Sequence, residues 1–197
     1  FLLEEGFWKL KELIKTDETP KAKNDSAILI KPLPIKISGI NYYPSEHPWS
    51  DFWNKFDITT TVKDFNNVKA LGLNTVRVFI PYEDFGGAYV QDTSLNKLDQ
   101  LLNIASQMNI KVIPTLFDFP PGYSYKNYPA TRQHAQTIFR KFGKHPAILA
   151  WDIKNEPDLD FKIYGKDAVL EWLDLIIGVA REEGVEQSLT IGWSHAK

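Results

Sequence analysis

The segment AILAWDIKNEP, residues 147–157, joins a buried-looking strand to a polar end. Its apolar run predicts a β-strand over 147–153. The run stops at Asn155-Glu156-Pro157, where the proline cannot continue a ladder of strand hydrogen bonds. Taken alone, this tripeptide indicates only a strand end followed by a turn. An amide and a carboxylate are adjacent there, and their role has to be inferred from the surrounding segments.

Four similar apolar runs predict further strands, at 35–42, 73–80, 109–117 and 188–193. Amphipathic patterns between the runs predict helices at 59–71, 94–108, 131–143 and 166–183, the second capped by Ser94. Continuous apolar strands that alternate with helices indicate a parallel sheet covered by helices. The sequence therefore predicts the α/β class.

The spacing of the runs distinguishes two architectures of that class. Strands recur at roughly 40-residue intervals, close to the repeat of a (β/α)8 TIM barrel. Five such units fit 197 residues and eight do not. We therefore expect an incomplete barrel of about five units over residues 35–197, with an open doubly wound sheet as the alternative. The first strand lacks the G-x-G-x-x-G turn that a dinucleotide-binding sheet would need.

Residues 1–34 precede these units and are predicted to form a helix and a linker. Leu3, Phe7, Leu10 and Ile14 recur at helical spacing, and the polar stretch TDETPKAKNDS follows. The chain begins FLLEEGFWKL, without an initiator Met or a recognisable signal peptide, so we expect a processed or trimmed start.

Composition excludes several functions. The chain carries 25 acidic and 23 basic side chains, a net charge of −2, which gives no electrostatic case for nucleic acid or an anionic membrane. No apolar run approaches the roughly 20 residues of a membrane span. Cysteine is absent, which removes disulfides and thiolate chemistry. His47, His134 and His145 show no metal-binding spacing, so we expect neither a metal site nor a cofactor.

Polar and aromatic residues gather at the ends of the predicted strands, where parallel α/β folds place their functional groups. They are Asn41, Tyr42, Arg77, Asp118, Asn155, Glu156, Trp193 and His195. Such a set suits a polar, ring-shaped ligand. Trp49, Tyr123 and Tyr125 in the predicted loops are expected to be exposed and able to stack on the flat face of such a ligand.

The motifs GINYYP, GLNTVRVFIPY, HPAILAWDIKNEP and LTIGW, in this order, resemble the first five units of a clan-A retaining glycosidase. The closest resemblance is to glycoside hydrolase family 5, the cellulase and β-mannanase family. It implies an O-glycosyl hydrolase of β-linked glucan or mannan, with Glu156 as acid/base and Asn155 on the sugar 2-hydroxyl. Arg77 would lie beside the nucleophile, and Asn41, Tyr42, Asp118, Trp193 and His195 would contact substrate. The resemblance favours a secreted or cell-envelope location.

The sequence does not identify the second carboxylate, the nucleophile, that a retaining glycosidase needs. The family places its nucleophilic Glu at the end of the seventh strand, so we expect it in C-terminal units beyond this sequence and little activity from this chain alone. Asp118 paired with Glu156 is an alternative. Asp152 is expected to be structural, with a cationic or hydrogen-bonding partner, and Arg77 is a candidate for that role.

A different class of function also fits half a barrel. A non-catalytic carbohydrate-binding module would leave a strand edge uncovered. Such a chain should associate with itself or with the remaining barrel half.

Overall fold

The computed structural model describes residues 2–4, 7–9 and 36–195. One sheet of seven strands runs in the order β1-β2-β3-β4-β5-β6-β7. The strands are β1 (Leu2–Glu4), β2 (Phe7–Lys9), β3 (Gly39–Asn41), β4 (Thr75–Phe79), β5 (Lys111–Phe117), β6 (Ala150–Asn155) and β7 (Ser188–Gly192). Neighbouring strands from β3 to β7 are parallel, which confirms the predicted sheet.

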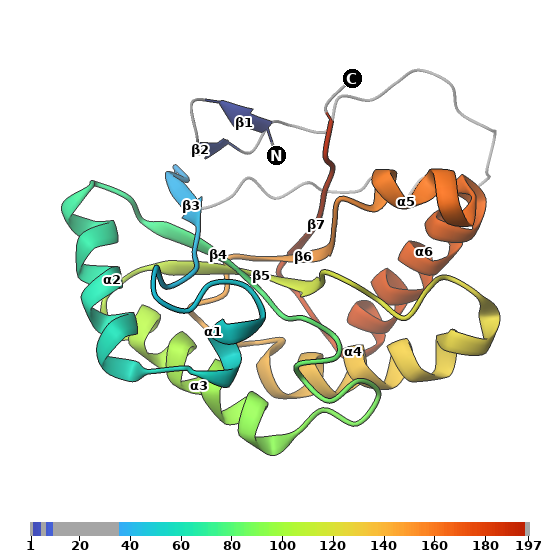
Figure 1. Cartoon of the computed structure of the whole chain (residues 1–197), viewed down its shortest axis with the longest axis horizontal. Coiled ribbons are helices and arrows are strands. Elements are labelled where there is room, and N and C mark those ends of the chain that lie inside the picture. Colours follow the sequence, from blue (N-terminus) through green and yellow to red (C-terminus); the bar gives the residue numbers. More distant parts are fainter. Residues whose placement is uncertain (1, 5–6, 10–35, 196–197) are drawn as a thin grey trace.

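The helices are α1 (Ser50–Asn54), α2 (Ile58–Ala70), α3 (Asp92–Gln107), α4 (Tyr128–Phe142), α5 (Pro157–Tyr164) and α6 (Lys166–Glu182), with a 3-10 turn at Tyr125–Asn127. The strand order from β3 to β7 follows the chain without reversal. Right-handed crossovers in one direction place their helices on one face of a sheet. Figure 1 shows α2, α3 and α4 on the same side, opposite β1 and β2. This is barrel-type and not doubly wound architecture.

The apolar pattern explains the helices. Each of the four predicted helices is present within three residues of its expected start, and each buries an apolar stripe against the sheet. Trp53, Trp151 and Trp172 are fully buried in this core. Two indole N–H groups find acceptors there, since Trp53 donates to Phe79 O at 2.7 Å and Trp172 to Thr131 Oγ1 at 3.1 Å. The buried core therefore holds the sheet, and with it the strand ends, in place.

The helix cap predicted at Ser94 is wrong. Helix α3 begins at Asp92, and Ser94 lies buried in its first turn, where its Oγ donates to Asp84 O at 3.3 Å. The Ser94 hydroxyl therefore anchors the preceding loop and does not cap the helix. Asp57 does cap α2, because its carboxylate accepts from Thr60 N at 2.6 Å.

The helix predicted near the start of the chain is wrong at its described residues. Residues 2–4 and 7–9 are the antiparallel strands β1 and β2, and Trp8 pairs with Gly39 of β3. The edge of β3 offers unpaired backbone groups, and Phe and Trp favour strands, so pairing outweighs the helical spacing. The rest of the predicted helix and linker lies outside the described residues.

Candidate active site

A buried ion pair lies beneath the C-terminal end of the sheet. Arg77 of β4 donates from Nε to Asp152 Oδ2 on β6 at 3.0 Å, and its Nη2 also contacts that oxygen. Thr115 of β5 donates to the same oxygen at 2.8 Å. The N–H of Gly192 on β7 donates to Asp152 Oδ1 at 2.9 Å. We call these four residues the ion-pair cluster; it confirms that Asp152 is paired and that Arg77 is its cation.

The cluster depends on a glycine in β7. A Cβ added at Gly192 would lie 2.8 Å from Arg77 Nη2 and 3.2 Å from Asp152 Oδ2. A larger residue at this position would require the guanidinium and the carboxylate to shift. Thus four strands, β4 to β7, are joined by one buried carboxylate, which sets the geometry of the layer above it.

Above the ion-pair cluster lies a second group, Asp118, Asn155 and Glu156, which we call the rim cluster. Arg77 Nη2 donates to Asn155 Oδ1 at 3.0 Å, and Asn155 Nδ2 donates to Asp118 Oδ1 at 2.9 Å. These two contacts fix which way the Asn155 amide faces. Arg77 Nη1 also reaches Asn41 Oδ1 at 3.4 Å. Four residues predicted from separate strand ends are therefore brought together.

Burial raises the pKa of the Asp118 carboxyl above its usual range. The hydrogen bond from Asn155 opposes that rise, as do the nearby charges of Lys154 and Arg77. The surroundings of Asp118 thus disfavour its charged form.

Glu156 has a left-handed backbone, with φ 48° and ψ 51°, which side-chain-bearing residues rarely adopt. Its N–H donates to Gly192 O at 2.5 Å, and the buried Pro157 begins α5 directly after it. The side chain is half-buried and lines a cavity of about 180 Å³. Its carboxylate has no hydrogen bond or ion pair to any residue that the structure describes, so it is available to a ligand.

The cavity lies between the segment after β5, the end of β6 and helix α5. It is lined by Asp118, Phe119, Pro120, Tyr123, Lys154, Asn155, Glu156, Leu159, Asp160 and Tyr164. Phe119 and Leu159 are more than half exposed, which gives the polar cavity an apolar margin.

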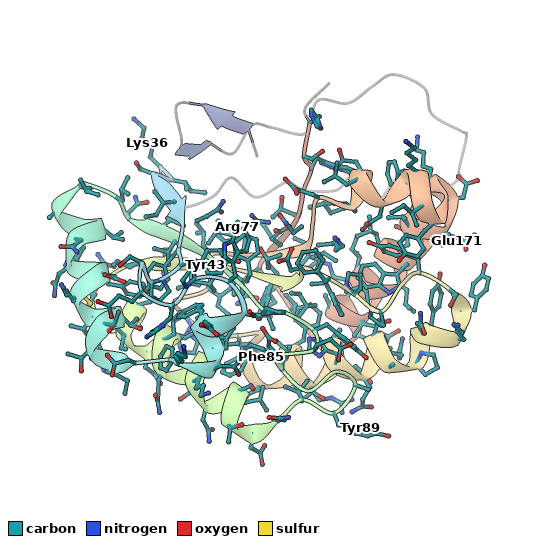
Figure 2. The ribbon with its side chains drawn as sticks, viewed as in Figure 1. Lys36, Tyr43, Arg77, Phe85, Tyr89 and Glu171 are labelled. Carbon is teal, nitrogen blue, oxygen red and sulfur yellow. The ribbon has the colours of Figure 1, made fainter. Side chains whose placement is uncertain are left out.

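The structure does not bring Tyr42 to this site. Its ring is buried against Phe52 and Phe65 on the helical side, and its hydroxyl donates to Asp64 Oδ2 at 3.0 Å. Tyr43 faces the site instead: it stacks on Phe79 with ring centroids 5.3 Å apart. Burial raises the Tyr43 pKa, and the Asp118 charge adds to that rise. Figure 2 shows Tyr43 and Arg77 together near the middle of the sheet.

Trp193 and His195 do not line the cavity. Trp193 is half-buried and packs edge-on against Phe161, with centroids 5.9 Å apart. His195 is exposed, and its Nδ1 lies 2.6 Å from Ser194 Oγ. Their contact with a substrate stays a prediction.

Of the three aromatic residues expected to be exposed, two are confirmed. Trp49 is 65% exposed and Tyr125 is 72% exposed. Tyr123 is buried, because its ring packs against Trp172 and its hydroxyl bonds to Asp160. Lys154 and Asp160 were not predicted as part of the site. A lysine inside an apolar strand was a signal for Lys154, whereas Asp160 lies on a helix that the sequence did not predict.

Within residues 36–195 and the two N-terminal strands, no three His, Cys, Asp or Glu side chains are grouped to hold a metal ion. In the same part of the chain, no helix has both the length and the apolar character to span a membrane.

Sequentially ordered parallel strands, with an amide and a cavity-lining carboxylate at their C-terminal ends, define the class: an incomplete (β/α)8 barrel with a polar site at the strand ends. The family model Cellulase (glycosyl hydrolase family 5) matches residues 34–194. The chain belongs to glycosyl hydrolase family 5.

Solved structures and a curated protein resemble the chain over only part of their own length. The exo-β-1,4-mannosidase Op5Man5 from Opitutaceae bacterium strain TAV5 is 25% identical with a TM-score of 0.70, over 79% of this chain and 31% of that one. GH5_18 from Bifidobacterium longum is 20% identical with a TM-score of 0.64, over 78% and 43%. Mouse β-glucuronidase is 29% identical, over 72% of this chain and 20% of its own length. The chain thus spans less than half of each.

Proposed function

We propose that the chain supplies the acid/base side of a retaining β-glycosidase, with Glu156 as the catalytic acid and base. The observation that carries this proposal is the rim cluster. A carboxylate with no partner among the described residues borders a cavity beside an amide whose orientation is fixed by Arg77 and Asp118. General acid catalysis needs a carboxyl group within hydrogen-bond reach of the bound substrate, and the place of Glu156 at the cavity allows that.

The chemistry proceeds in two displacements. In the first, the protonated Glu156 carboxyl gives its proton to the departing glycosidic oxygen while a second carboxylate attacks the anomeric carbon. In the second, ionised Glu156 takes a proton from water, which then releases the sugar from the enzyme. Asn155 has two amide N–H bonds, and Asp118 accepts one of them. The other remains for a sugar hydroxyl.

The nucleophile is proposed to come from barrel strands beyond β7. Asp118 fits that role poorly, because its Oδ1 already accepts from Asn155 and burial raises its pKa. A nucleophilic carboxylate needs to be ionised, and a raised pKa opposes that. Residues Leu189 and Ile191 of β7 are half exposed on the strand where the next barrel unit would pair. This favours association of the chain with the remaining half of a barrel.

A β-mannoside is the proposed substrate. Op5Man5 is an exo-β-1,4-mannosidase, and a Streptomyces cattleya GH5_18 variant of the same fold was solved with Manβ1-4GlcNAc. The choice between mannan and glucan depends on groups around the whole ring of strands. The test below therefore compares a β-mannoside with a β-glucoside as substrates.

The test measures release of nitrophenol from nitrophenyl β-mannoside and β-glucoside. The chain alone should show background rates, and a barrel in which it supplies strands one to five should cleave the mannoside faster. Glu156→Gln in that barrel should lower turnover about 100- to 10,000-fold. Turnover by the chain alone, abolished by Glu156→Gln, would instead support the Asp118–Glu156 pair. Unchanged turnover in the substituted barrel would refute the role of Glu156.

A further inference from the structure

The peptide group between Asn155 and Glu156 is held at both ends. Its N–H, from Glu156, donates to Gly192 O at 2.5 Å. Its C=O, from Asn155, accepts from Lys154 Nζ. The orientation of this peptide group sets the left-handed φ of Glu156 and hence the direction in which its carboxylate leaves the backbone. A left-handed backbone is unfavourable for a residue other than glycine, so surrounding contacts must maintain it.

Lys154 is an unusual donor for that carbonyl. It follows the apolar Ile153 in β6, and only 5% of its side chain is exposed. A buried ammonium needs an opposite charge, and Asp160 of α5 supplies it, with Oδ2 at 3.3 Å from Nζ. A neutral amide or a water molecule would satisfy a carbonyl without this desolvation cost. The presence of a charged donor therefore points to a demand for a strong, fixed hydrogen bond.

Asp160 is fixed in turn by the core. The hydroxyl of Tyr123 donates to Asp160 Oδ2, and burial together with that carboxylate raises the Tyr123 pKa, which keeps the phenol protonated as a donor. The Tyr123 ring packs edge-on against Trp172, which is fully buried in α6. A continuous path thus runs from the helical core through Tyr123, Asp160 and Lys154 to the carbonyl before Glu156. We call these three residues the Lys154 network.

From this geometry we infer that Lys154 is a positioning residue for Glu156: through the Asn155 carbonyl it holds the left-handed backbone that aims the Glu156 carboxylate into the cavity. Its catalytic consequence rests on the proposed function, whereas its conformational consequence does not. Lys154 itself need not touch a substrate. Without its ammonium, the peptide group keeps one anchor of two, and the Glu156 backbone samples the more common negative φ values.

The conformational test uses the chain labelled for NMR. The three-bond coupling between the Glu156 amide and α protons reports φ, and the exchange rate of the amide proton reports its bond to Gly192. Lys154→Met retains the aliphatic bulk and removes the charge. It should move the coupling away from its left-handed value and speed exchange at least about 10-fold, the factor that follows from losing about 1.4 kcal/mol of local stability.

Lys162→Met is the matched control, since Lys162 is an exposed lysine of α5 near the same site. It should leave both readouts unchanged. If Lys154→Met does not fold, Asp160→Asn and Tyr123→Phe test the same network while Lys154 stays in place. Folded variants with an unaltered Glu156 coupling and exchange rate would overturn the inference.

A kinetic test separates positioning from general loss of structure. Dinitrophenyl leaving groups depart without a proton, whereas alkyl groups need one. In the complete barrel, Lys154→Met should lower kcat/KM, which reports the step that expels the leaving group, about 10- to 100-fold for the poor leaving groups and less than about 3-fold for the dinitrophenyl β-mannoside. Equal losses with both substrates would show that Lys154 has a purely structural role.

The two proposals fail differently. If Glu156→Gln shows no dependence on the leaving group, the acid/base assignment is wrong, yet the NMR effect of Lys154→Met still stands. If Glu156→Gln shows that dependence and Lys154→Met does not, only the positioning role is wrong.

Discussion

The ion-pair cluster and the rim cluster lie one above the other and are linked by the bond from Arg77 to Asn155, yet their carboxylates differ in hydrogen bonding. Asp152 accepts from Arg77, Thr115 and Gly192, so both of its oxygens are occupied. Asp118 accepts from Asn155, and the Glu156 carboxylate has no partner among the described residues. Saturated hydrogen bonding gives a fixed geometry, and spare bonding capacity gives a place for a ligand. The difference indicates that the lower cluster aligns the strands and the upper one meets the substrate.

The largest effect is expected when the ion-pair cluster is broken. Asp152→Ala leaves the Arg77 guanidinium buried without its main counter-charge, and the loss should be about 3–5 kcal/mol of the free energy of unfolding. Urea denaturation measures it. Arg140→Ala is the control: Arg140 pairs with Glu183 at the surface and should matter by less than about 1 kcal/mol. Equal losses in the two variants would mean that the ion-pair cluster has no special structural role.

The pH dependence of stability tests a second buried group, the His134 imidazole. His134 is buried against Tyr82 and Phe117, and burial lowers its pKa from 6.5 to about 4. The unfolded chain therefore binds a proton between these values that the folded chain does not. Stability should fall by about 3 kcal/mol as the pH drops from 7 to 4.

The control for this titration is His134→Gln, whose stability should depend less on pH over the same range. The exposed His195 replaced by Gln should leave the wild-type slope unchanged. A His134→Gln variant with the full wild-type slope would place the pH dependence elsewhere.

A smaller effect of opposite sign is expected at the rim cluster. Glu156→Gly removes the side chain that makes the left-handed backbone unfavourable and should stabilise the chain by about 1 kcal/mol. Glu156→Gln keeps the backbone penalty and should leave thermal stability near that of the wild type. Destabilisation by the glycine would show that the Glu156 carboxylate is a structural group.

The smallest effect is expected at Asp118. Its raised pKa means that the charged form is disfavoured on folding, so Asp118→Asn should leave stability unchanged or raise it by less than about 1 kcal/mol at pH 7. That gain should vanish at acidic pH, where the wild-type carboxyl is protonated in both states. Asp152→Asn should destabilise the chain strongly at pH 7. The same Asp-to-Asn change therefore has different effects in the two clusters. Similar losses at both positions would remove the distinction.

Much of the barrel was predictable because its strands are nearly continuous apolar runs and its helices carry one apolar face. The start of the chain was not, because β1 and β2 exist through pairing with the edge of β3, and helical spacing says nothing of such an edge. Helix α5 was missed because it is short and begins at a proline that also marks the end of a strand.

The site was predictable where a residue type is rare at a strand end, as at Arg77, Asn155 and Glu156. The choice between Tyr42 and Tyr43 depended on which face of β3 points inward, and the alternation from Asn41 would have favoured Tyr43. Lys154 could not be placed from the chain alone, because its partner Asp160 lies on the helix that was not predicted.

The most direct test of the account is azide rescue of Glu156→Ala in the barrel that contains this chain, with dinitrophenyl β-mannoside as substrate. Without the base, the glycosyl-enzyme should form and then wait for water, so turnover should stall after a burst. Azide needs no base, and it should restore turnover and give the β-mannosyl azide. A variant that turns over at the wild-type rate, or that azide leaves unchanged, would contradict the assignment of Glu156.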